Sequence, residues 1–471
     1  MKKTKVVCTI GPASEQKDCL EKLIGTAGMN VMRMNFSHGD YDEQGFRIKN
    51  VKALNAEKGW FTGMALDTKG PEIRTGELNM SDAEGYKGVQ INAGDKVVIS
   101  MDYPFKGGKQ EDGSIKVSIS YAGLYDDISV GNKILIEDGL LQLEVKEKAA
   151  NRELVCEALN SRKLKNKRNC NVPGVVLNMP YISPKDKADM EFACDQNLDF
   201  IFASFVRRPD DIKQIRDILA AKNNTHVKVI SKIENQEGVK NMEEIIALSD
   251  GVMVARGDLG VDVDAWDLPE IQKDMIFLAQ SQGKIVITAT QMLDSMQQNP
   301  RPTRAEVSDV YNAVLDGTCG TMLSGESAQG DYPFEAVSYM AKIDERAEED
   351  IDHNMMIDNV VYNKDDMNES DALGLAAATI ANVFDIAAIV CEGDVELALN
   401  ISQFRPASDV FFAVETADEA RTLSIAWGIQ AVVGNIDDAL ACAKKTLGLE
   451  AGDQLIKICG ASKKLELTEV K

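Results

Sequence analysis

The chain has 471 residues, and its 44% hydrophobic and 27% charged composition is typical of a globular protein with a large core. The 52 basic and 75 acidic residues leave a net charge of −23, which argues against a protein that binds nucleic acid or an anionic membrane surface. Nine scattered cysteines, no apolar leader and no apolar run of about 20 residues predict a cytoplasmic protein that does not span a membrane. Only three histidines are present, so a zinc site is not favoured, and any metal is expected to be a hard cation held by oxygen ligands.

Eight short, continuous apolar runs recur along the chain, and most are followed by a stretch with helical periodicity, such as Ser14–Ile24 or Pro209–Leu219. Continuous runs are typical of strands that are buried on both faces of a parallel sheet. They predict a (β/α)8 barrel, with an open doubly wound sheet as the alternative. The runs are Lys5–Ile10, Met29–Asn35, Thr62–Asp67, Asp199–Ser204, Val227–Lys232, Gly251–Ala255, Lys284–Thr290 and Gly320–Ser324.

Far more chain than one helix needs separates the third run from the fourth. Residues 72–170 alternate apolar and polar side chains between glycine-containing turns, which predicts an all-β insert. After residue 345 an acidic connector leads to a second βα region, which predicts a C-terminal α/β domain. Its expected strands are Ala387–Cys391, Val410–Val414, Ala431–Val433 and Gln454–Ile458.

Polar side chains gather where the predicted barrel strands end. In a barrel these ends meet at one mouth, where the active site lies. Four carboxylates, two arginines and a lysine at one mouth exceed what chance placement would give. The residues are Arg33, Asn35, Ser37, Asp67, Thr68, Ser204, Lys232, Glu234, Arg256, Asp258, Thr288, Thr290, Ser324 and Glu326.

The segment Ser231–Asn235 places Lys232 and Glu234 on the same side of an extended chain. Glu234 and Asp258 can hold Mg²⁺, which takes one or two protein carboxylates together with water and substrate oxygens. Lys232 can neutralise the charge of a transferring phosphoryl group, and Gly257 lets the backbone approach a ligand closely. For each motif taken alone, the alternative is an ordinary surface ion pair.

Oxygen-bearing side chains are also dense in Met34–Gly39 and Leu66–Gly70. Asn35, Ser37 and the pair Asp67–Thr68 could surround a weakly hydrated monovalent cation. The residues alone favour the other interpretation, which is turn and helix-capping chemistry.

Taken together, these motifs resemble those of the pyruvate kinase family. The resemblance is strong over residues 1–75 and 171–345, fair in the β insert and weak after Arg346. It implies a (β/α)8 catalytic barrel of residues 1–71 and 171–345, an inserted β-barrel lid of residues 72–170, and a C-terminal α/β domain of residues 346–471. The matching stretches are Val7–Pro12, Met32–Gly39, Leu66–Arg74, Ile230–Asn235, Met253–Gly260, Ile287–Glu306 and Leu323–Ser327.

The resemblance implies a glycolytic enzyme, expected to be a cytoplasmic homotetramer, that transfers the phosphoryl group of phosphoenolpyruvate to ADP and releases pyruvate and ATP. Arg33 and Lys232 would contact the phosphoryl group, and Thr290 would help to deliver a proton through water. The implied ligand sets are Glu234 and Asp258 for Mg²⁺ or Mn²⁺, Asn35, Ser37, Asp67 and Thr68 for K⁺, Gly257, Asp258 and Thr290 for the substrate carboxylate, and Asn35, His38, Arg74 and Arg168 for the nucleotide.

Two departures from the family pattern matter. Arg168 stands where the family usually has a lysine, and the two side chains differ in geometry. The segment Cys391–Leu397 carries three carboxylates where members activated by sugar phosphates have hydroxyl groups, and Ala461–Leu467 replaces a second effector loop. Carboxylates repel a phosphate at close range, so we expect no activation by fructose 1,6-bisphosphate at this pocket.

Two other functions compete with an active kinase. A catalytically silent regulatory paralogue would explain the altered effector segments, but the intact set of predicted site residues argues against it. A barrel aldolase would need a Schiff-base lysine in a pocket with few carboxylates, whereas Lys232 lies two residues from Glu234.

Overall fold

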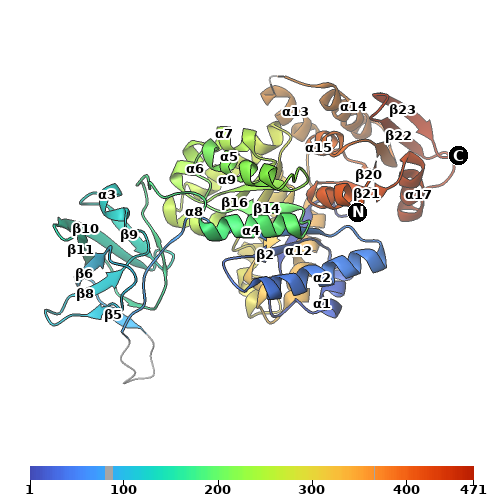
Figure 1. Cartoon of the computed structure of the whole chain (residues 1–471). Coiled ribbons are helices and arrows are strands. Elements are labelled where there is room, and N and C mark those ends of the chain that lie inside the picture. Colours follow the sequence, from blue (N-terminus) through green and yellow to red (C-terminus); the bar gives the residue numbers. More distant parts are fainter. Residues whose placement is uncertain (80–87, 365) are drawn as a thin grey trace.

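The computed structural model describes residues 1–79, 88–364 and 366–471. Figure 1 shows three units in a row, with a β-rich lid at one side, a barrel in the centre and a C-terminal α/β unit at the other side. The lid leaves the barrel after its third strand and returns before its fourth. No helix of the described residues is long and apolar enough to cross a membrane.

The central unit is a closed barrel of parallel strands, which confirms the predicted (β/α)8 fold. The first strand pairs with both the second and the last, Lys5 with Gly320 and Val7 with Val31, so the sheet has no free edge and is not an open doubly wound sheet. The strands are β1 (Lys5–Thr9), β2 (Met29–Asn35), β3 (Gly63–Asp67), β14 (Phe200–Ala203), β15 (Lys228–Ile233), β16 (Gly251–Ala255), β17 (Ile285–Ala289) and β18 (Gly320–Leu323).

Helices surround the barrel, and several begin at sequence signals that can be identified by eye. Ser183 and Thr303 each form a capping box with the acidic residue three positions later. The first helix begins at Lys17 rather than at the predicted Ser14, because Ser14 closes a turn with Gly11. The elements are α1 (Lys17–Lys22), π-helix η1 (Leu23–Ala27), α2 (Tyr41–Lys58), α4 (Pro184–Asp195), α5 (Pro209–Ala221), α6 (Gln236–Lys240), α7 (Met242–Leu248), α8 (Arg256–Asp262), α9 (Leu268–Ser281), 3-10 helix η3 (Asp294–Gln297), α10 (Arg304–Leu315), α11 (Gly325–Ala328) and α12 (Pro333–Glu348).

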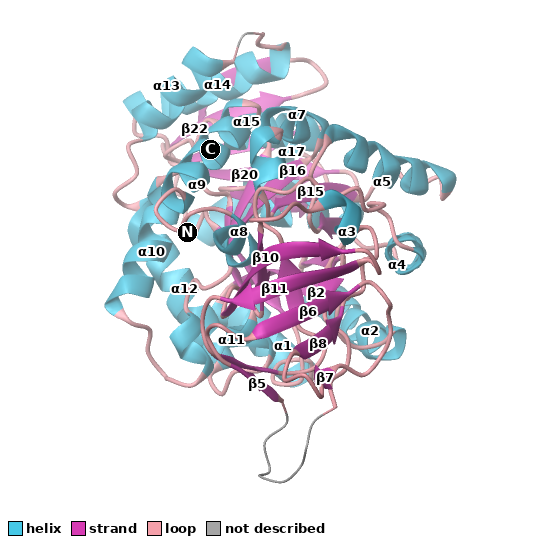
Figure 2. Ribbon diagram, turned by 90° about the vertical axis from the view of Figure 1, so that its left-hand side faces the viewer, coloured by secondary structure: helices cyan, strands magenta, loops and turns pink. Residues whose placement is uncertain are grey.

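The insert is a β domain with its own apolar core, as predicted, and it lies in front of the barrel in Figure 2. Its main sheet has the order β4-β13-β9-β10-β11-β6-β8-β7, and β12 pairs with β5. One helical turn, α3 (Leu124–Asp127), departs from an all-β composition. The strands are β4 (Ile73–Arg74), β5 (Val89–Ile91), β6 (Lys96–Ser100), β7 (Gly108–Lys109), β8 (Ile115–Ser118), β9 (Lys133–Ile136), β10 (Leu141–Ala149), β11 (Glu153–Ala158), β12 (Arg162–Leu164) and β13 (Asn169–Asn171).

The C-terminal unit is a five-stranded sheet of order β21-β20-β19-β22-β23 with helices on both faces. The last strand was not predicted, because Ala461–Leu467 was interpreted as a loop; it folds back antiparallel on β22. The predicted domain boundaries stay predictions. The elements are α13 (His353–Asn363), α14 (Glu369–Val383), β19 (Ala388–Glu392), α15 (Val395–Gln403), β20 (Asp409–Val414), α16 (Ala417–Thr422), 3-10 helix η4 (Leu423–Ile425), β21 (Ile429–Val433), α17 (Ile436–Leu447), β22 (Gln454–Cys459) and β23 (Lys464–Glu469).

A buried ion pair joins the barrel to the C-terminal unit. Asp199, next to β14, has no exposed side-chain surface and accepts hydrogen bonds from Arg421 Nε at 3.0 Å and from the backbone N–H of Met64 at 2.8 Å. His226 Nε2 lies 3.0 Å from the same carboxylate. Since Arg421 belongs to α16, this carboxylate connects the two units through charge-assisted hydrogen bonds.

We predict that Arg421→Ala destabilises the protein by roughly 3 kcal/mol, because it leaves the buried Asp199 without its guanidinium partner. Differential scanning calorimetry would measure the loss as a lower transition temperature. The matched control is Arg152→Ala, which breaks an exposed pair with Asp126 and should lower the transition temperature much less, because water screens that pair. Equal decreases in transition temperature for the two variants would contradict a stabilising role of the buried Asp199–Arg421 pair.

Candidate active site

The centre of the barrel mouth is a chain of alternating charges from three strands. Asp67, the last residue of β3, lies 2.6 Å from Arg33 Nε of β2 through Oδ2 and 3.0 Å from Lys232 Nζ of β15 through Oδ1. Lys232 Nζ also lies 3.1 Å from Glu234 Oε1. All four side chains are at least nine-tenths buried, so the contacts are poorly screened by water.

Pairing decides the protonation states of these groups. Burial alone would raise the pKa of Asp67, but Arg33 and Lys232 hold it below its usual value. Burial opposes the charge of Lys232 as well, yet Asp67 and Glu234 raise its pKa above the ordinary lysine value. Asp67 is therefore a carboxylate and Lys232 a fixed cation, which cannot serve as a neutral nucleophile.

Ser204 completes this group, although the sequence analysis gave it no role. It follows β14, donates from Oγ to the Thr68 carbonyl at 2.6 Å and accepts from Lys232 Nζ at 2.8 Å. Its backbone N–H donates to Thr68 Oγ1 at 3.0 Å. Its position at a strand end was the only signal in the sequence.

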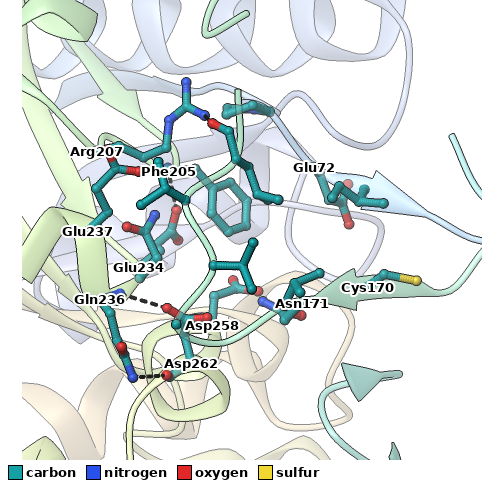
Figure 3. A pocket seen from close by; sticks show the side chains of 18 of the residues that line it. Glu72, Cys170, Asn171, Phe205, Arg207, Glu234, Gln236, Glu237, Asp258 and Asp262 are labelled. Atoms are coloured by element: carbon teal, nitrogen blue, oxygen red, sulfur yellow. Dashed lines mark hydrogen bonds between the residues drawn. The ribbon is translucent and has the colours of Figure 1, made fainter. Parts of the chain in front are cut away.

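The two predicted metal ligands, Glu234 and Asp258, line one cleft of about 870 Å³ between the barrel and the lid. Figure 3 shows both side chains along this cleft. Glu234 Oε2 accepts the backbone N–H of Phe205 at 2.7 Å. Burial, followed by the repulsion of Glu234, raises the pKa of Asp258 to about 7.

A divalent cation fits this pair. Two crowded carboxylates repel one another, and a hard cation between oxygen donors would remove that repulsion. Among the described residues no cluster of three or more His, Cys, Asp or Glu side chains could hold a metal. Two lid residues that the sequence analysis missed, Asp138 and Glu72, also raise the pKa of Asp258.

Three of the four predicted K⁺ ligands have side chains with partners in the protein. Asn35 Oδ1 accepts the backbone N–H of Ser37 at 3.0 Å, Thr68 Oγ1 accepts the backbone N–H of Ser204 at 3.0 Å, and Asp67 faces its two cations. Turn chemistry therefore accounts for the contact of Asn35, whereas Thr68 is bonded to a distant strand end, and the K⁺ role stays a prediction.

The turn at residues 35–38 has its own support. Gln44 Nε2 of α2 donates to the His38 carbonyl at 3.1 Å and to the Asn35 carbonyl at 3.4 Å. Arg47 Nη1 donates to Gln44 Oε1 at 3.0 Å and is itself paired with Glu15 at 2.8 Å. The predicted ligands are thus presented by a rigid turn.

The residues predicted for the substrate carboxylate meet at the ends of β16 and β17. The backbone N–H of Gly257 donates to Thr290 Oγ1 at 2.7 Å, and Asp258 follows in α8. Thr290 has a φ of 70°, an uncommon conformation for a β-branched residue. Unusual backbone of this kind is often found at functional sites.

The predicted nucleotide residues divide into two groups. Asn35 and His38 line a second cavity, of about 1060 Å³, that begins at Arg33. Arg74 and Arg168 belong to the lid, where Arg74 pairs with Glu72 at 2.6 Å and Arg168 Nε lies 3.6 Å from Glu137. The structure does not bring the two groups into one cavity.

Comparisons with known proteins agree with this geometry. The family model described as pyruvate kinase, barrel domain, matches residues 1–337. The chain is 46% identical to a pyruvate kinase of Bacillus licheniformis, over 92% of this chain and 72% of that protein. It is 47% identical to one of Geobacillus stearothermophilus, over 91% of this chain and 71% of that protein. A crystal structure of a pyruvate kinase from Cryptosporidium parvum matches with a TM-score of 0.92 at 37% identity and covers 100% of this chain and 96% of that one.

We predict that Asp258→Asn raises the thermal transition temperature without divalent cation, by roughly 2 °C, because it removes the repulsion with Glu234. The same variant should lose the stabilisation that Mg²⁺ gives the wild-type protein, since ligand binding to the folded state raises stability. Thermal unfolding with and without Mg²⁺ measures both effects.

Asp262→Asn is the control on the same helix. Asp262 accepts the backbone N–H of Gln236 at 2.7 Å, so this variant should be less stable but should keep its response to Mg²⁺. A full Mg²⁺ response in Asp258→Asn would rule out Asp258 as a ligand.

Proposed function

This chain belongs to the pyruvate kinase family, and we propose that it transfers the phosphoryl group of phosphoenolpyruvate to ADP with the residues at the barrel mouth. The main support for the proposed roles of these residues is the buried chain of charges from Arg33 through Asp67 and Lys232 to Glu234. The alternative of a silent paralogue gains no support from the comparisons, since the relatives reported above are themselves described as pyruvate kinases.

Arg33 and Lys232 neutralise the phosphoryl group as it moves between the two substrates. Phosphoryl transfer requires mainly positioning and the stabilisation of negative charge. Lys232 suits this role because its neighbours keep it protonated, and its position is set by hydrogen bonds to Asp67 and Ser204. A cation held in place needs no reorganisation during the reaction.

Glu234 and Asp258 would hold Mg²⁺ or Mn²⁺, and Asn35, Ser37, Asp67 and Thr68 would hold K⁺. A bound divalent cation supplies positive charge for substrate oxygens. The carboxylate of phosphoenolpyruvate would take donors from Gly257, Asp258 and Thr290. Gly257 now donates to Thr290, so substrate binding would exchange this hydrogen bond.

Thr290 orients the water that protonates the enolate of pyruvate after phosphoryl transfer. Asn35 and His38 from the barrel, and Arg74 and Arg168 from the lid, bind the nucleotide once the lid closes further. Closure would also exclude water, which competes with ADP for the phosphoryl group. A homotetramer, the expectation drawn from the family resemblance, completes the proposal.

The start of α15 carries carboxylates where fructose 1,6-bisphosphate would have to bind. Asp394 caps this helix by accepting the backbone N–H of Leu397 at 2.9 Å. Glu392 accepts the backbone N–H of Ile436 at 3.1 Å, next to α17. Carboxylates therefore occupy backbone donors that a phosphate would need, and they add repulsion.

We predict that the purified protein forms pyruvate from phosphoenolpyruvate and ADP with Mg²⁺, and more rapidly with K⁺ than without it. Lys232→Met should lower kcat by roughly 10³-fold, because it removes the fixed cation. The control is Lys240→Met in the same cleft, where the exposed side chain should change kcat less than about twofold. A coupled lactate dehydrogenase assay measures all of these, and no turnover by the wild-type protein would favour the silent paralogue.

We predict that fructose 1,6-bisphosphate leaves the half-saturating phosphoenolpyruvate concentration unchanged within about twofold. Rate curves with and without the sugar bisphosphate give the comparison. Asp394→Ser is an informative variant, because serine keeps the helix cap while the carboxylate is lost. A large drop in the half-saturating concentration for the wild-type protein would contradict the prediction.

A further inference from the structure

The turn after β17 is held in a conformation that its own residues do not favour. Thr290 and Gln291 both have left-handed backbone, with φ of 70° and 54°. A β-branched side chain makes this conformation costly, so surrounding contacts must maintain it. The proposed function uses Thr290, and the contacts that maintain the turn therefore decide where its hydroxyl points.

Arg256, the first residue of α8, supplies three of those contacts, beside the bond from the Gly257 N–H to Thr290 Oγ1. Its Nη2 donates to the Thr290 carbonyl at 2.7 Å and lies 2.7 Å from Met292 Sδ, and its Nε donates to the Ala289 carbonyl at 3.3 Å. The side chain is 10% exposed. One guanidinium group thus contacts residues before and after Gln291 in the turn. Lysine cannot reproduce this forked set of donors.

Asp309 of α10 orients this guanidinium from the other side. Arg256 Nη1 lies 2.7 Å from Asp309 Oδ1, while the remaining neighbour, Gln272 Oε1, is 3.4 Å away. Asp309 is 36% exposed and lies on the outer ring of helices, so it does not touch the mouth itself. The contact path runs from α10 through Arg256 to the turn that carries Thr290.

We propose that Arg256 and Asp309 are a positioning pair that sets Thr290 for the protonation of enolpyruvate, an inference that rests on the proposed function. In that step a proton moves from a water bound to Thr290 to the methylene carbon. The electron pair of the C=C bond forms the new C–H bond, the enolate oxygen becomes the ketone oxygen, and the hydroxide left behind takes a proton from solvent.

The pair should affect protonation more than phosphoryl transfer. Arg33 and Lys232 lie on β2 and β15, and among the described residues neither shares a hydrogen-bond or ion-pair partner with Arg256. Loss of Asp309 frees the guanidinium to rotate and lets the Thr290 hydroxyl move. A displacement of about 1 Å at a reacting centre can lower the rate by up to roughly a hundredfold.

The test compares Asp309→Asn, Arg256→Lys and Asp309→Glu with the wild-type protein. The readout is the exchange of the methyl protons of pyruvate with D₂O, followed by ¹H NMR with Mg²⁺, K⁺ and ATP present, because this exchange reverses the protonation step. We expect exchange to fall roughly tenfold or more in Asp309→Asn and Arg256→Lys, with partial recovery in Asp309→Glu. The KM for phosphoenolpyruvate should change by a smaller factor than the exchange rate does, because Thr290 is only one of three groups proposed for the substrate carboxylate.

Asp316→Asn is the matched control, since it removes a salt bridge to Lys273 at the far end of α10. Unchanged exchange in Asp309→Asn would overturn the proposal. A parallel loss of exchange, substrate binding and thermal stability would also overturn it, because that pattern indicates a merely structural pair. If the wild-type protein shows no turnover, the proposed function is refuted. The wild-type measurement therefore distinguishes that failure from a failure of the positioning pair.

Discussion

The carboxylate of Asp67 lies fully inside the barrel mouth, bound by the guanidinium of Arg33 on one side and the ammonium of Lys232 on the other. A buried charge without a partner costs several kcal/mol. Removal of Arg33, Asp67 or Lys232 would therefore leave at least one buried charge with fewer partners, at a large cost in stability. The three residues come from β2, β3 and β15, strands that the sheet order brings close together with β14 between β3 and β15. The cationic centre therefore forms only when these strands pair in this order. The cation that the reaction needs is kept protonated by the same contacts that hold it in position.

Two features near this centre lower the stability of the folded protein. Glu234 and Asp258 crowd two carboxylates into one cleft, and the turn after β17 holds Thr290 in left-handed backbone. Both features lie at strand ends, whereas the strands themselves are mainly apolar and buried. Unfavourable local features of this kind are expected where a protein binds ions or orients a reacting group. The packing of the surrounding core offsets their cost in folding free energy.

A net charge of −23 is unexpected in a protein whose proposed substrates are anions, and the distribution of the charge explains it. More than half of the excess lies after residue 345, in the C-terminal unit. There, acidic side chains cap helices: Asp394 caps α15, while Glu419 and Asp438 belong to the capping boxes of α16 and α17. Carboxylates at helix N-termini are favourable, so much of this charge has a structural use remote from the barrel mouth.

The sequence by itself determined the barrel, the β insert and the C-terminal α/β unit, because continuous apolar runs, alternating runs and capping signals are local patterns. It also predicted which polar side chains lie at the mouth, since strand ends in a barrel converge whatever the loops do. Only the tertiary structure decided their partners. Lys232 meets Asp67 across 165 positions, and Arg256 meets Asp309 across 53, separations at which no local pattern records a contact. For the same reason, the sequence assigned no role to Ser204 or Asp138 and did not predict strand β23. The contacts of each depend on another segment of the chain.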